Sequence, residues 1–212
     1  MRDHDAGHET YTLFGPYKAV FGVGMRNGLE GIGSPIAQLP GQPAFVVQGP
    51  DYTGTSGTLI LAPSAQQLSS FTTAQLSPLS GGASLQNGTP AWDDRHGVNC
   101  CVDDETSGAS FCLPSEWDTG NPPTYVEWPA DTDGGVTTLP GGDQVQVTLG
   151  TASAPLGQYG FTIGMPPTPG IDEVEVEPAI GAGFINIGTA LFFHYDALFD
   201  ALHGKVGLAS HP

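Results

Sequence analysis

Residues 184–209 read FINIGTALFFHYDALFDALHGKVGLA, and this stretch says more about the fold than any other part of the chain. An apolar pair followed by glycine, Ile187-Gly188, precedes an apolar run at 190–193 that predicts a short turn of helix. Residues 195–200 and 204–209 then predict two strands separated by a turn that contains Gly204. The stretch therefore predicts a β-rich end to the chain, with little helix.

The remainder of the chain follows the same pattern, since short apolar or alternating runs recur between Gly, Pro, Asn and Asp residues. These runs predict strands at 44–48, 58–62, 124–128, 144–149, 160–164 and 173–177. One further helix is expected over 64–71, with Ser64 as its N-cap. The fold class predicted from the sequence is all-β.

Composition excludes several functional classes. The 212 residues include 22 acidic and 5 basic side chains, a formal charge of −17, which argues against binding to nucleic acids or to an anionic membrane surface. A hydrophobic content of 39% with only 13% charged residues is typical of a folded domain rather than a disordered acidic chain. No apolar run is long enough for a membrane span, and residues 1–10 do not have the pattern of a secretory signal.

Asp118-Thr119-Gly120 is the most informative local motif. Such a turn places a carboxylate on a tight loop, and its glycine lets a second loop approach closely. A carboxylate in this position can share a proton with a second carboxylate and activate water. The tripeptide alone also occurs in many ordinary turns, so the surrounding sequence must show whether it forms a catalytic loop.

The context resembles the pepsin-like aspartic proteases. The tail at 184–209 resembles the end of such a protease. Segments 20–24 and 34–39 resemble the stretch that closes the family's first lobe, and 44–47 and 57–62 resemble the two strands that follow it. The resemblance covers roughly residues 18–209. It implies a β-barrel lobe, with Asp118, Thr119 and Gly120 as the catalytic loop and Ile187-Gly188 crossing behind it as structural support. The family also implies secretion.

The chain departs from the family at its front end. The first Asp-Thr-Gly and the flap that follows it have no counterpart, so residues 1–76 are expected to form an incomplete N-terminal lobe and residues 77–212 a nearly complete C-terminal lobe. The Ser- and Gly-rich segment 77–89 fits a linker between them, or one long loop in a single domain. Asn121 stands where the family has Ser or Thr, and Glu116-Trp117 stand where it has two apolar residues.

Three functions remain open from the sequence. The first is an aspartic peptidase in which a homodimer pairs two copies of Asp118, because one carboxylate cannot serve as acid and base together. Its substrate would be a peptide or small ester, and no cofactor is expected. The second is a metal-dependent hydrolase of esters or phosphoesters, with Zn²⁺ held by His4, Asp5, His8 and Glu9. The third is a non-catalytic remnant or binding module.

Three cysteines leave two readings open. Cys100 or Cys101 could form a disulfide with Cys112, leaving one thiol over, or all three could be reduced thiols. The sequence does not choose between these pairings.

Overall fold

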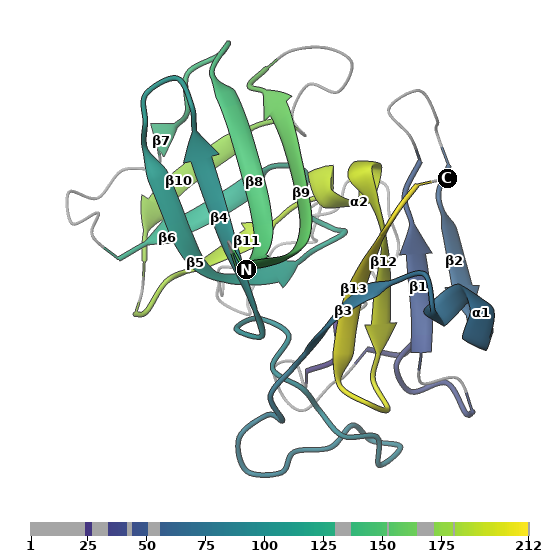
Figure 1. Ribbon diagram of the computed structural model, residues 1–212. Helices are drawn as coiled ribbons and strands as arrows, with labels where there is room; N and C mark the ends of the chain where they lie inside the picture. The colour runs from purple at the N-terminus through teal and green to yellow at the C-terminus, as the bar shows by residue number, and fades with distance from the viewer. Residues whose placement is uncertain are drawn as a thin grey trace, which may run out of the picture.

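The computed structural model describes residues 24–26, 34–41, 44–50, 56–129, 137–151, 153–164, 172–179 and 181–211. The described chain is almost entirely β-structure, in two sheets that lie side by side (Figure 1). The all-β prediction is therefore confirmed. No helix in these ranges is long and apolar enough to cross a membrane.

The smaller sheet has five strands in the order β2-β1-β12-β13-β3. Their bounds are β1 (Ala44–Gln48), β2 (Thr58–Leu61), β3 (Thr72–Gln75), β12 (Tyr195–Asp200) and β13 (Lys205–Ser210). All neighbours in this sheet are antiparallel. Strands from both sides of the expected lobe boundary at 76/77 thus pair in one sheet, where the C-terminal hairpin lies between β1 and β3 (Figure 1).

The larger sheet has eight strands in the order β7-β10-β6-β11-β5-β4-β8-β9. Their bounds are β4 (Val98–Asp104), β5 (Ser110–Trp117), β6 (Thr124–Trp128), β7 (Thr137–Thr138), β8 (Gln144–Thr151), β9 (Ala154–Thr162), β10 (Val174–Pro178) and β11 (Phe184–Ile187). Strands β5 and β6 follow one another in sequence but do not pair. Strand β11 lies between them, parallel to β5 and antiparallel to β6.

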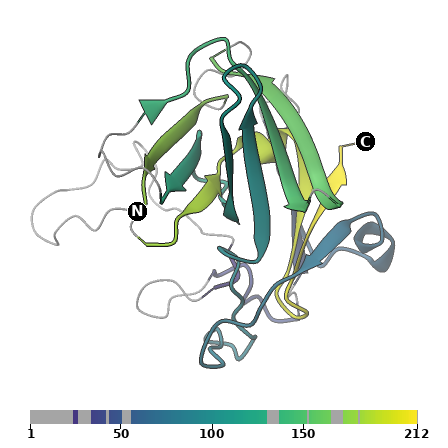
Figure 2. The ribbon, with the colours of Figure 1, turned by 60° about the vertical axis from the view of Figure 1, so that its left-hand side comes forward.

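One hydrophobic core joins the two sheets. Phe45 of β1 stacks on Phe199 of β12 with ring centroids 5.1 Å apart, and Trp117 of β5 meets Phe199 edge-on at 6.1 Å. A hydrogen bond also joins the two sheets, since the hydroxyl of Tyr195 in β12 donates to the carbonyl oxygen of Gln158 in β9 at 2.6 Å. Figure 2 shows the two sheets from a second direction. Burial of these large aromatic side chains from both sheets fixes the sheets relative to one another.

The two helices form where the sequence predicts them. Helix α1 (Ala65–Leu68) begins after Ser64, whose hydroxyl accepts from the backbone N–H of Gln67 while the Gln67 side chain accepts from the Ser64 N–H. Helix α2 (Ala190–His194) leads directly into β12. The strand expected at 160–164 ends instead at Thr162, because Gly164 adopts a positive φ of 68° that turns the chain.

The cysteines take one of the pairings that the sequence left open. Cys101 of β4 and Cys112 of β5 face one another across the sheet and form a disulfide. Cys100 points to the opposite face, where it is fully buried, and burial raises the pKa of its thiol. Cys100 is therefore a core residue in this structure rather than a reactive thiol.

Reduction of this disulfide should lower the free energy of unfolding by about 3 kcal/mol, because the bond closes a loop between residues 11 apart in sequence. Urea unfolding with and without reductant measures the change. Thiol titration of the denatured, unreduced protein should find one thiol, that of Cys100, and three thiols would contradict the pairing.

Candidate functional site

Asp118 lies at the end of β5, where the chain leaves the sheet before returning as β6. Its backbone N–H donates to the carbonyl oxygen of Ile187 at 3.0 Å, which ties the start of the loop to β11. Its half-buried carboxylate accepts from the backbone N–H of Gly120 at 2.8 Å and from the side-chain amide of Asn186 at 3.1 Å. Two N–H donors on two different oxygens hold the carboxylate in one orientation.

Gly188 lies directly behind the loop that begins at Asp118. A Cβ atom at this position would stand 2.4 Å from the carbonyl oxygen of Asn121 and 2.2 Å from that of Pro123. The next residue, Thr189, donates from its backbone N–H to the Asn121 carbonyl oxygen at 2.8 Å. Only glycine allows the chain after β11 to pass this close to the loop.

The structure therefore brings together all five residues of the predicted catalytic loop and its support, Asp118, Thr119, Gly120, Ile187 and Gly188. Their catalytic role stays a prediction. Sequence reasoning missed Asn186, which contributes the second hydrogen bond to the Asp118 carboxylate. The signal available in the sequence was its position one residue before Ile187. Burial alternates along β11, so Asn186 faces the side opposite to the buried Ile187, and this is the side on which Asp118 lies.

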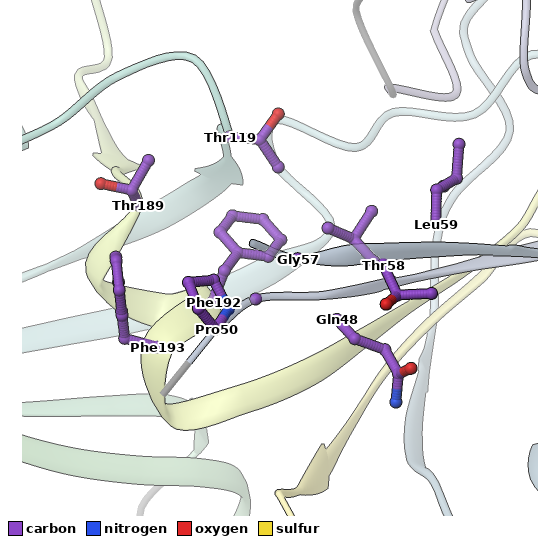
Figure 3. A pocket seen from close by; sticks show the side chains of 11 residues that line it. Gln48, Pro50, Gly57, Thr58, Leu59, Thr119, Thr189, Phe192 and Phe193 are labelled. Carbon is purple, nitrogen blue, oxygen red and sulfur yellow. The ribbon is translucent and has the colours of Figure 1, made fainter. Parts of the chain in front are cut away.

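A pocket of about 430 Å³ borders the loop. Thr119 and Thr189 line it on one side, while Gln48 and Thr58 line it on another (Figure 3). The complete lining is Val47, Gln48, Gly49, Pro50, Gly57, Thr58, Leu59, Thr119, Thr189, Phe192 and Phe193. None of these side chains is charged. Asp118 itself is not among them, so the pocket adjoins the carboxylate rather than surrounding it.

The sheet face that carries Asp118 is strongly acidic. In register across the sheet, Glu116 of β5 aligns with Asn186 of β11, which aligns with Tyr125 of β6 and then with Glu175 of β10. Burial, followed by the nearby Glu175, raises the pKa of the Tyr125 hydroxyl.

In the described part of the chain, Arg95 contacts this acidic face. The guanidinium of Arg95 lies 2.9 Å from Glu116 and 4.3 Å from the centre of the Phe184 ring. In the next row of the sheet, burial and the neighbouring Glu177 raise the pKa of Glu127. The run at 173–177 thus forms one edge of a negative surface, and Arg95 neutralises Glu116, two residues before Asp118 in the sequence.

His194 lies at the end of α2, near the pocket. Its ring stacks on that of Tyr159 with centroids 4.4 Å apart. Burial, with a smaller contribution from the charge of His211, lowers the pKa of His194 to about 4 from an ordinary 6.5. The folded protein thus holds this imidazole neutral at pH values where the unfolded chain protonates it.

This lowered pKa predicts that the folded protein loses stability as the pH falls from 6.5 towards 4, since the unfolded state binds the extra proton across that range. Replacement of His194 by Phe keeps an aromatic ring but removes the titration, so the loss should become shallower. Urea unfolding of both proteins across this pH range measures it. An unchanged pH dependence in the variant would contradict the assignment.

The alternative metal site cannot be placed. His4, Asp5, His8 and Glu9 lie outside the described residues, and their role stays a prediction. Within the part of the chain that the structure describes, no group of three or more His, Cys, Asp or Glu residues is arranged to hold a metal ion.

Comparison with known proteins gives similarity at the level of structure only. No protein-family model and no curated protein sequence matches the chain. Among solved structures, it is similar to an aspartic proteinase from Irpex lacteus, with 16% identity and a TM-score of 0.45, over 80% of this chain. It is also similar to basic 7S globulin from soybean, with 13% identity and a TM-score of 0.47, over 84% of this chain. The chain spans 56% of the length of each. Because both TM-scores are below 0.5, neither similarity decides what this chain does.

Proposed function

We propose that this chain supplies one half of an aspartic peptidase site, with Asp118 as one of two catalytic carboxylates. The observation that carries the proposal is the anchoring of this carboxylate by Gly120 and Asn186 in front of the Gly188 crossing. A carboxyl group serving only as a turn residue would need the Gly120 contact alone. Here Asn186 of β11 also donates its side-chain amide to the Asp118 carboxylate.

The chemistry requires a second carboxylate, which we propose a second copy of Asp118 supplies. Two carboxyl groups in contact cannot both ionise, so one is ionised and the other is protonated. The ionised group takes a proton from water, whose oxygen attacks the peptide carbonyl carbon, while the protonated group donates to the carbonyl oxygen. Collapse of the tetrahedral intermediate breaks the C–N bond and transfers a proton to the leaving amine.

Replacement of Asp118 by Asn tests the proposal. Peptide hydrolysis by the self-associated protein should disappear in this variant, whereas chelating agents should leave wild-type hydrolysis unchanged. Loss of hydrolysis with chelator, restored by Zn²⁺, would instead support the metal-dependent alternative.

A non-catalytic binding module is the second candidate, and the uncharged pocket beside Thr119 favours it. This candidate requires no second carboxylate. It differs from the first in that the wild-type protein would hydrolyse no peptide at any pH, while an apolar peptide would still protect the pocket residues from hydrogen exchange.

Secretion is also part of the proposal. The Cys101–Cys112 disulfide supports it, because such bonds persist in oxidising compartments.

A further inference from the structure

Among the residues that the structure describes, the outer edge of β2 and the adjoining pocket form a surface without a charged side chain. We call this surface, made of Thr58–Leu61 and the residues that line the pocket, the neutral face. The chain as a whole carries 22 acidic and 5 basic residues. The residues of the neutral face include none of these charged side chains.

The backbone of β2 offers hydrogen-bonding groups on this face. In the order β2-β1-β12-β13-β3, β2 is an edge strand, and no described strand pairs with its outer side. Ala62 donates its N–H to the Ala44 carbonyl oxygen at 3.2 Å, so the residues bonded to β1 are alternate ones that include Ile60. It follows that Leu59 and Leu61 direct their N–H and C=O groups outward.

The side chains of the same two residues are also exposed. Leu59 and Leu61 are each 43% exposed, and both project from the same face of the sheet. Leu59 lies opposite Val47, and both line the pocket. An apolar edge strand that carries no Lys and no Pro is a template for pairing with another strand.

We propose that a second copy of this chain docks on the neutral face, with β2 pairing antiparallel to its counterpart. Two chains of charge −17 repel one another, and a contact between them is least unfavourable where charge is absent. A two-fold axis beside the outer edge of β2, level with Ile60, would place Leu59 and Leu61 of one copy beside those of the other, which is a self-complementary arrangement.

The need for a second copy rests on the proposed function, because the proposed mechanism uses a second carboxylate beside that of Asp118. Thr119 lines the pocket, so the neutral face reaches the loop that holds Asp118. In this proposal, the chain that supplies the second Asp118 and the chain that pairs with β2 are both copies of this protein.

The test is the mass of the protein in solution. Sedimentation of the wild type over a range of concentrations should show a monomer–dimer equilibrium. Added salt should strengthen it by screening the repulsion between the two acidic chains. The double variant Leu59→Glu, Leu61→Glu should weaken association by roughly a hundredfold or more.

The matched control is Leu202→Glu, at an exposed leucine of the turn between β12 and β13. It adds one negative charge per chain, where the double variant adds two, at a side chain that is 53% exposed, and it should associate far more strongly than the double variant. Equal weakening in the control and the double variant would mean that charge alone acts, and it would overturn the assignment of the face.

Hydrogen exchange on the wild type keeps the proposal testable if the double variant fails to fold. The amides of Leu59 and Leu61 should exchange more slowly as protein concentration rises, and exchange that is independent of concentration would overturn the proposal. A wild-type protein that stays monomeric at every concentration and salt level would do the same. An Asp118→Asn protein that dimerises and still hydrolyses peptide would remove the proposed function while leaving the interface in place.

Discussion

The Asp118→Asn variant should lose peptide hydrolysis by at least about a thousandfold while it keeps its fold. Asn has the shape of Asp but cannot take a proton from water, so the general-base step fails. Its single side-chain oxygen can accept from Gly120 or from Asn186, but not from both as the carboxylate does. The loss of one hydrogen bond should lower the free energy of unfolding by only about 1 kcal/mol. Hydrolysis assays and urea unfolding on the same preparations measure the two effects.

Mixtures of the variant with the wild type test the pairing itself. If each site needs an Asp118 from both chains, then hydrolysis at a fixed total concentration falls with the square of the wild-type fraction. A site that uses one carboxylate gives a linear fall, which would contradict the paired mechanism. Glu105→Gln is the control, because it removes one exposed carboxylate on the turn between β4 and β5 and should leave hydrolysis unchanged.

Local patterns predicted much of the fold. The N-cap residue Ser64 predicted the start of α1, and the alternation at 144–149 predicted β8, because neighbouring residues determine such features. The tail at 184–209 predicted the order of α2, β12 and β13. These elements depend on contacts close in the sequence.

Long-range arrangement was harder to predict. Nothing near β1 indicates that its neighbour is β12, some 150 residues later, since that pairing follows from packing such as that of Phe45 on Phe199. Asn186 was missed for the same reason, because its importance comes from Asp118, 68 positions away. The neutral face combines residues of four separate segments, none of which is unusual alone.

Replacement of Gly188 by Ala should destabilise the protein strongly, because the added methyl group has no room behind the loop. The new Cβ would meet the carbonyl oxygens of Asn121, Pro122 and Pro123 at 2.4, 2.8 and 2.2 Å. All three are backbone atoms, so the loop or the strand must move. We expect the free energy of unfolding to fall by about 3 kcal/mol, at the upper end of the range for overpacking. Thermal and urea unfolding measure it.

The same substitution should also impair hydrolysis in the molecules that remain folded. The loop at 121–123 follows Asp118 directly, so a shift of its backbone disturbs the bond from the Asp118 N–H to Ile187 and the orientation of the carboxylate. Gly141→Ala is the matched control, because a Cβ at Gly141 meets nothing within 4 Å and its φ is not in the left-handed region. Equal stability of the two alanine variants would contradict the close crossing behind Asp118, and with it the physical basis for treating this loop as a catalytic one.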